Sequence, residues 1–530
     1  MPVLADLLHA LLLPLRIVLR LIHRLLYSPT WRTTYPVTRT LPEPVAPAAR
    51  KGTWTLRTRT GESPLGPVKH TLNGNTGRQL WTFDPAAAPA AWEADALSHF
   101  RREYEAMAEV RHHSADEPLR LQALRETGGK RRAAKPLPKG AAEAEQVDAS
   151  LRHGIGFYGS LQMEDGHWPG DYGGPMFLLP GLVIACYVTE TELPAEHRAE
   201  MLRYLRNHQN EDGGTGLHIE GHSTMFGTSL NYVAARLLGM AADDPHCLRA
   251  RAFMHGRGGA VNNTSWAKFW LALLGVYEWR GINPLPPEMW ILPYWLIVHP
   301  GRFWCHCRMV YLPMSYLYGK RAACPPTPLT EALRKELYVE PYSEIAWEEQ
   351  RNNCGPADMY VQHHPLQDLL WKVVAAAEPW IPAWLRRRAL SWCADMILHE
   401  DGSTRHVDIG PVNKAINMVC CWYDDPHGEA FKAHLPRIFD YLWLAEDGMK
   451  MQGYNGSQAW DTAFAVQAIA ASGLGEEAEV SPILRKAHEY LDASQVREDC
   501  PEVERYYRHI SNGAWPFSTQ DPADRSRPAV

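Results

Sequence analysis

The sequence predicts an all-α protein built from stacked helix pairs, on three observations. From about residue 149 onward, apolar residues recur with a helical period, in segments separated by turns that carry Gly, Pro or Asn. Alternation of apolar and polar residues, which marks a half-buried strand, is scarce. A loose repeat, Q-x-x-x-G-x-W, stands at the ends of helical segments. Helix–turn repeats of this kind build solenoids and closed α/α toroids.

Length and composition set the first limits. The chain has 530 residues, which predicts two domains plus extensions. The formal net charge is −6 and no basic stripe accompanies a nucleic-acid motif, so we expect no nucleic-acid partner. Ten cysteines without C-x-x-C spacing indicate reduced thiols and no disulfide framework. Nothing in the sequence specifies an oligomeric state.

The first element is an apolar, helix-compatible segment at residues 3–27. Arg16, Arg20 and Arg24 recur along it at helical spacing and form a narrow basic stripe. We interpret residues 1–30 as an amphipathic helix that lies in the membrane interface. A transmembrane span is disfavoured because it would bury these arginines in hydrocarbon, and an organelle transit peptide is the alternative.

The next elements follow from the helical periodicity of apolar residues and from the positions of Gly and Pro. Residues 31–148 form an extension rich in Pro, Ala, Arg and Gly, in which the stretch 128–145 is expected to be a linker or surface loop. Helices are expected within 176–188, 223–241 and 459–475, where apolar residues recur at helical spacing.

The repeat marks where helices turn. Its first copy is Gln162–Trp168, and a second begins at Gln209 but carries Thr215 where Trp would stand. A degenerate copy ends at Trp515, with Gln495 displaced upstream. The glycine permits the turn, and the Gln and Trp are expected to tie one unit to the next by hydrogen bonding and stacking. Thr215 is therefore expected to weaken one of these ties.

This repeat resembles the QW motif of squalene and oxidosqualene cyclases. Long blocks resemble eukaryotic oxidosqualene cyclases in the same order: 166–181, 216–227, 266–288, 299–319, 442–465 and 506–521. The resemblance covers about residues 70–521, except for 128–145.

The resemblance implies an α/α-barrel protein of two toroidal domains. The first barrel would occupy 149–440 and the second would begin at 441–521 and remain incomplete, followed by a tail, 522–530, unlike the family. The family is monotopic in the endoplasmic reticulum membrane or on lipid droplets, and its substrate is 2,3-oxidosqualene. An acid opens the epoxide, carbocations form successively, and one base removes a proton, without metal or organic cofactor. Aromatic faces stabilise the cations without attacking them.

Three candidate residues come from the first part of the match. Tyr172 in GDYGGP matches a tyrosine that shapes the substrate during ring closure, and a locally bonded turn tyrosine is the alternative. Trp304 and His306 in FWCHCR match a cavity pair, in which the histidine directs the final deprotonation. A buried structural histidine is the alternative for His306. A metal site with Cys305 and Cys307 is disfavoured, because consecutive residues rarely all reach one ion.

Three more candidates come from the second part. Tyr454 in MQGYNGSQ is a candidate catalytic residue: lanosterol synthases carry Thr there, whereas cycloartenol synthases carry Tyr, which favours cycloartenol as the product. Trp460 matches a cavity tryptophan that offers a π-face to the cation. Phe517 matches a phenylalanine near the early-ring cations. Core packing is the alternative for Trp460 and Phe517.

The end of the match departs from the family. The family continues into Asp-Cys-Thr-Ala-Glu, whose Asp opens the epoxide, whereas here residues 522–530 follow Asp521. Asp521 belongs to the preceding block, and Asp524 lacks the Cys and Thr context. The chain as written is therefore expected to be inactive, either as an incomplete cyclase or as a catalytically dead membrane-bound protein. Asp424 and Asp425 suggest a third reading, a class I prenyl-transfer enzyme with magnesium, although a helix-end turn accounts for them.

Overall fold

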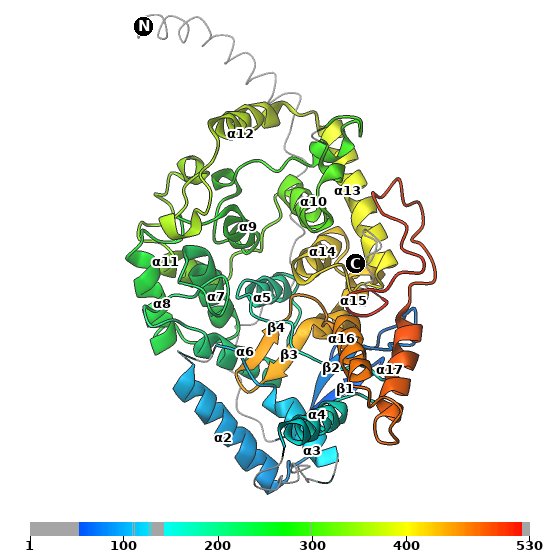
Figure 1. Cartoon of the computed structure of the whole chain (residues 1–530). Helices are drawn as coiled ribbons and strands as arrows, with labels where there is room; N and C mark the ends of the chain where they lie inside the picture. Colours follow the sequence, from blue (N-terminus) through cyan, green and yellow to red (C-terminus); the bar gives the residue numbers. More distant parts are fainter. Residues whose placement is uncertain are drawn as a thin grey trace, which may run out of the picture.

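A computed structural model of the chain describes residues 52–521, apart from 109, 111, 127, 129–141 and 298. The predicted membrane helix (1–30), most of the predicted linker (128–145) and the tail (522–530) lie outside this part. Helices dominate the described residues, which confirms the all-α class (Figure 1). Their strands form two antiparallel hairpins, β1 (Thr53–Thr58) with β2 (Gln79–Asp84) and β3 (Leu442–Ala445) with β4 (Gly448–Met451).

An inner ring of helices is visible in Figure 1. They are α5 (Leu178–Val188), α7 (Met225–Leu237), α9 (Ser265–Leu273), α10 (Cys305–Lys320) and α14 (Pro411–Asp424). Contacts join α5 to α7, α7 to α9, α10 to α14 and α14 back to α5. The ring closes between α9 and α10, where the Trp266 indole N–H donates to the Tyr311 hydroxyl at 3.2 Å. Because nearly every residue of α5, α7, α9 and α14 is buried, this ring contains the main hydrophobic core.

Further helices surround this ring. They are α6 (Ala195–Asn207), α8 (Pro245–His255), α11 (Pro328–Glu336), α12 (Pro365–Ala377), α13 (Ala383–Ser403) and α15 (Glu429–His434). Side-chain caps start several helices where the sequence places Thr or Asp. Thr224 accepts from the Gly227 amide, and Thr264 accepts from the Ala267 amide. Such paired inner and outer helices give the α/α-barrel architecture that the repeat predicted.

A second, smaller core lies between α4 (Glu143–Ser160), α16 (Gln458–Ala471) and α17 (Ser481–Ser494). Trp168 is fully buried in it, with Ile155 and Ile469. Helix α4 begins at Glu143, so the end of the stretch predicted as a linker is helical. The division of the chain into domains at 149 and 441 remains a prediction.

Part of the predicted extension has its own structure. Helices α2 (Ala91–Met107) and α3 (Glu117–Glu126) lie there with the hairpin β1–β2. Strand β2 contacts β3, and the rings of Trp81 and Trp443 meet edge to face with centroids 5.8 Å apart. The extension therefore packs against the hairpin β3–β4, which leads to Tyr454.

The repeat glutamines do make the expected ties. The Gln162 amide donates to Gly166 O at 2.9 Å, across its turn, and to Ile483 O at 3.0 Å, on α17. The Gln209 amide repeats this pattern, with Gly213 O and His246 O both at 2.9 Å. Each glutamine therefore fastens its own turn to a neighbouring helix.

The repeat tryptophans make their indole hydrogen bonds within their own helix–turn units, not to the next unit as predicted. Trp168 stacks on Tyr158, with centroids 5.4 Å apart and planes at 7°, and its indole N–H donates to Tyr158 O at 2.8 Å. The degenerate copy is similar, because the Trp515 indole N–H donates to Leu491 O at 2.7 Å. At Thr215 a backbone bridge to Thr224 takes the place of the ring.

Candidate active site

The six candidate residues come from five segments and gather into one contiguous group. Tyr172 lies on the loop before α5, Trp304 caps the N-terminus of α10, and Tyr454 follows β4. The remaining members are His306 in the first turn of α10, Trp460 in α16 and Phe517 near the C-terminal end of the described chain. We call this set the aromatic cluster.

Ring contacts run through the whole aromatic cluster. Tyr172 lies roughly parallel to Tyr454, with centroids 5.8 Å apart, and both rings contact Phe517, at 5.1 Å and 5.2 Å. Phe517 also contacts Trp460 at 5.3 Å. These separations are typical of interacting aromatic side chains. Residues that are far apart in the sequence therefore present a continuous aromatic surface.

His306 joins this surface to Trp304. The His306 Nε2 atom lies 2.6 Å from the Tyr454 hydroxyl, which is a short hydrogen bond. The His306 Nδ1 atom lies 3.1 Å from the Cys305 thiol, and the Trp304 ring lies 4.5 Å from the imidazole. The histidine is therefore held on both ring nitrogens, and its link with Tyr454 forms a dyad that can carry a proton.

The aromatic cluster is partly open. Tyr172, Trp304 and Trp460 have exposed fractions of 41%, 52% and 45%, whereas His306 and Tyr454 are half-buried. Among the described residues the aromatic cluster is thus an exposed surface with the dyad beneath it.

Phe464 belongs to this surface, although the sequence reasoning missed it. Its ring lies 5.2 Å from Trp460, and 57% of the side chain is exposed. Helical spacing could have found it, because residues i and i+4 lie on the same face of a helix.

The loop that carries Tyr172 is fixed on two sides. The Tyr172 amide donates to Gln452 Oε1 at 2.9 Å, and the Gly453 amide donates to Tyr172 O at 2.7 Å. On the other side the Ile219 amide donates to Gly174 O at 3.0 Å. Gly174 has a φ of +115°, and a Cβ there would clash with His218 Nε2, so the turn requires glycine.

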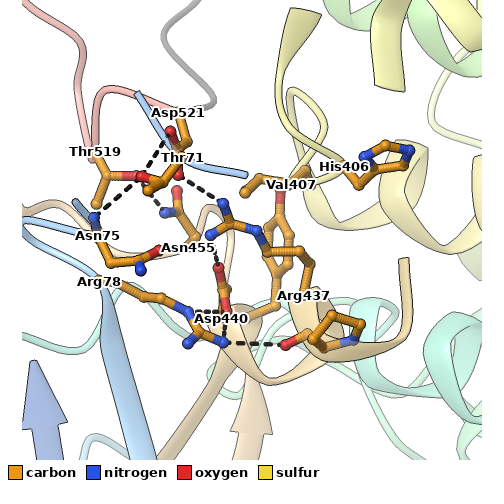
Figure 2. Close-up of polar contacts among 12 residues, drawn as sticks. Thr71, Asn75, Arg78, His406, Val407, Arg437, Asp440, Asn455, Thr519 and Asp521 are labelled. Atoms are coloured by element: carbon orange, nitrogen blue, oxygen red, sulfur yellow. Dashed lines mark hydrogen bonds and ion pairs between the residues drawn. The ribbon is translucent and has the colours of Figure 1, made fainter. Parts of the chain in front are cut away.

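Asp521 lies in a buried ion-pair network, as Figure 2 shows. Its carboxylate accepts from Arg437 Nη2 at 2.6 Å. It also accepts from the Leu72 amide at 2.7 Å. Arg437 also pairs with Asp440, which in turn accepts from Arg78 Nε at 2.8 Å. A carboxylate held in this way joins chain segments. That Asp521 is not the epoxide-opening acid remains a prediction.

The acidic run at the end of α14 also has local partners. Asp424 accepts from the Tyr316 hydroxyl at 3.2 Å, and Asp425 accepts from the His427 amide at 3.0 Å within the following turn. These contacts match the helix-end reading of the run.

Within the described residues, Asp401, Cys421 and His434 are close enough to share a metal ion. Asp401 accepts from the Cys421 thiol at 3.2 Å and from the Asn417 amide at 2.9 Å, so hydrogen bonds link part of this buried group. The Lys414 ammonium donates to His406 O, His434 O and His434 Nδ1 at 2.6, 3.1 and 2.7 Å. Nε2 of His434 then carries the ring hydrogen and faces Asp401 Oδ2 at 3.2 Å. An ion on Nε2 would have to displace that hydrogen.

Comparison with known proteins identifies the family. The squalene-hopene cyclase N-terminal domain matches residues 153–438. A cycloartenol synthase of Dictyostelium discoideum is 52% identical over 379 residues, which are 71% of this chain and 54% of that protein. The chain belongs to the oxidosqualene cyclase family. A lanosterol synthase of Mus musculus is 45% identical over 476 residues, which are 88% of this chain and 60% of that protein.

The chain is also similar to a relative that is named neither a cycloartenol synthase nor a lanosterol synthase. An alpha-onocerin synthase of Lycopodium clavatum is 42% identical over 483 residues, which are 88% of this chain and 62% of that protein. The chain thus spans between 54% and 62% of the length of these relatives. The inner helix ring lies within the matched domain, which ends just before β3.

Proposed function

We propose that this oxidosqualene cyclase acts on 2,3-oxidosqualene and forms a cyclic triterpenol. The observation that carries the proposal is the aromatic cluster, which gathers the six residues expected to face the substrate. Five of its members are Tyr, Trp or Phe. The negative π-faces of these aromatic rings stabilise carbocations and do not form bonds with them. The names of the relatives support the same substrate class.

We infer that the His306–Tyr454 dyad takes the last proton. In that step a C–H bond of the final cation breaks and the proton passes to the Tyr454 oxygen as the hydroxyl proton of Tyr454 moves to His306 Nε2. The electron pair of the C–H bond neutralises the cation. The pair forms a double bond in lanosterol and closes a cyclopropane in cycloartenol. Tyr454 lies between Tyr172 and His306, so its bulk determines which C–H bond reaches the base. We propose cycloartenol as the product because Tyr stands at this position.

A binding experiment tests the proposal without requiring turnover. The 530-residue chain, purified in detergent, is titrated with a tertiary ammonium analogue of oxidosqualene and with its neutral carbon isostere. We expect the cation to bind about tenfold more tightly, since each cation–π contact contributes about 0.5–1 kcal/mol at an exposed site and several rings of the aromatic cluster act together. Tyr172→Leu and Trp460→Leu should each reduce this preference, whereas Trp384→Leu, an exposed tryptophan on α13, should not. Equal binding of both analogues would refute the proposal.

Turnover is measured separately. Incubation with 2,3-oxidosqualene and mass spectrometry of the products distinguishes a working cyclase from a protein that only binds the substrate. Where cyclic product forms, Tyr454→Thr is expected to shift it from cycloartenol toward lanosterol. An unchanged product would contradict the role given to Tyr454.

We also propose that the chain attaches to one face of a membrane. Helix α12 has no buried residue, and Leu366, Leu369, Leu370 and Val373 are all exposed on it. In the stretch 292–297, Trp295 and Ile297 are 75% and 91% exposed. Such apolar surface is costly in water and fits a lipid interface. Within the described part of the chain, no helix has the length and apolarity that a bilayer span needs.

Vesicle flotation tests this attachment. Leu369→Gln with Leu370→Gln is expected to lower the fraction bound to phosphatidylcholine vesicles. Val147→Gln, at an exposed position on α4, is the control. Binding that is unaffected by the α12 change would place the contact elsewhere. The proposed location is the endoplasmic reticulum membrane or lipid droplets, which imaging of the tagged chain would check.

A further inference from the structure

Lys450 on β4 is a buried cation next to the loop that carries Tyr172. Its ammonium lies 2.6 Å from Asp171 Oδ2, 3.0 Å from Asp447 Oδ2 and 3.1 Å from the Ser114 hydroxyl. An ammonium has three N–H donors, so these contacts use its whole capacity. Only 3% of the lysine side chain is exposed, and the ion pair with Asp171 is shielded from solvent.

The charges of this group depend on one another. Burial disfavours the ammonium, but Asp171 and Asp447 outweigh it and hold the pKa of Lys450 above its usual value. Burial would likewise raise the pKa of Asp447, and Lys450 and His208 reverse that effect. Desolvation of such groups costs several kcal/mol, and well-packed apolar side chains in their place often stabilise a fold equally well or better. Stability alone therefore does not explain these ion pairs, and we look for a position in the fold that they fix.

The geometry that they fix is that of Tyr172. Asp171 directly precedes Tyr172, and its carboxylate binds Lys450, while the Tyr172 backbone binds Gln452 and Gly453. One extended segment, residues 450–454, thus supplies the ion pair, both backbone contacts and the ring of Tyr454. Little space is left, because a Cβ on Gly453 would lie 2.8 Å from Tyr172 Cε1.

We propose that Lys450 and Asp171 are positioning residues that set the Tyr172 ring against Tyr454, and so set where the aromatic cluster stabilises positive charge. This inference rests on the proposed function. Lys450 lies behind the loop and acts through Asp171, without contact with the substrate. Tyr172 is 41% exposed, so its ring is packed on one side only and could move. The ion pair of Asp171 with Lys450 restricts this movement.

The test measures the preference of the 530-residue chain for the ammonium analogue over its neutral isostere. Lys450→Met is expected to reduce this preference about twofold to fivefold, as Tyr172→Leu does. Asp171→Asn should reduce the preference less than Lys450→Met does. This variant should also keep the fold, since Lys450 retains Asp447 and Ser114 as partners. Lys268→Met is the matched control, because Lys268 is 1% exposed and donates to Gln350 O, Arg351 O and Asn353 O. That control should lower stability and leave the preference unchanged.

The outcomes separate this inference from the proposed function. If the wild-type chain shows no preference for the cation, the proposed function fails. A second outcome is that the wild type shows the preference and Tyr172→Leu loses it, while Lys450→Met and Asp171→Asn both keep it. That outcome overturns only the positioning role. Should Lys450→Met fail to fold, Asp171→Asn decides alone: a retained preference refutes the inference and a reduced one supports it.

Discussion

Replacement of Asp521 by Asn is a sharp test of the buried ion-pair network in Figure 2. The carboxylate accepts from Arg437 Nη2 at 2.6 Å with one oxygen. With the other oxygen it accepts from the Leu72 amide at 2.7 Å and the Thr71 hydroxyl at 3.3 Å. Asparagine has the same shape but one amide NH₂ in place of an oxygen. In either orientation a donor then faces a donor, at Arg437 or at Leu72.

The magnitude follows from these contacts. A hydrogen bond to a charged group contributes about 1.5–3 kcal/mol, and loss of one member of a buried ion pair costs about 3–5 kcal/mol. Arg437 keeps its second acid, Asp440, at 2.9 Å, so the guanidinium is not left unpaired. We therefore expect Asp521→Asn to lower the free energy of unfolding by about 2–4 kcal/mol.

Urea denaturation followed by tryptophan fluorescence measures this change, as the shift in midpoint multiplied by the slope. Asp395→Asn is the matched control, because Asp395 pairs with Arg505 at 2.8 Å but both side chains are largely exposed, at 42% and 45%. An exposed pair contributes about 1 kcal/mol or less. If Asp521→Asn destabilises the chain no more than Asp395→Asn, the structural role of Asp521 is wrong. Loss of turnover with unchanged stability would instead point to catalysis.

Three other predictions concern the repeat, a buried histidine and the aromatic cluster. Gln162→Leu removes two hydrogen bonds and should cost about 1–3 kcal/mol in urea denaturation, whereas Gln467→Leu, at an exposed site within α16, should have little effect. His197 is buried with neither ring nitrogen hydrogen-bonded, and burial lowers its pKa to about 3. As the pH falls below about 6.5, His197 becomes protonated in the unfolded chain but stays neutral in the folded chain. The free energy of unfolding therefore falls by about 1.4 kcal/mol per pH unit down to about pH 3. His197→Phe should flatten this pH dependence of the urea midpoint. Gly453→Ala should push the Tyr172 ring aside and weaken binding of the ammonium analogue without changing that of its neutral isostere, and equal weakening of both would argue against a cation site.

The sequence alone determined the local features of this protein. Gln162 and Trp168 mark a helix–turn unit because their spacing fits one turn. The structure gives Gln162 the predicted bond to a neighbouring helix, whereas the Trp168 indole bonds within its own unit. Helical periodicity predicted α5, α7 and α16 for the same reason, since it depends only on neighbouring residues. The family resemblance, carried by long motifs, predicted the six residues of the aromatic cluster.

The tertiary structure decided what depends on contacts between distant segments. Periodicity carries no information on which segments meet, so it did not show that β2 lies beside β3 or that α4 packs with α16 and α17. The contact of Phe464 with Trp460, beside the aromatic cluster, likewise depends on how the folded chain orients the two rings. The bond between His306 and Tyr454 and the ion pair between Asp171 and Lys450 each join residues from different elements. Such pairs form only when the chain folds and excludes water, because burial makes an unpaired polar group costly.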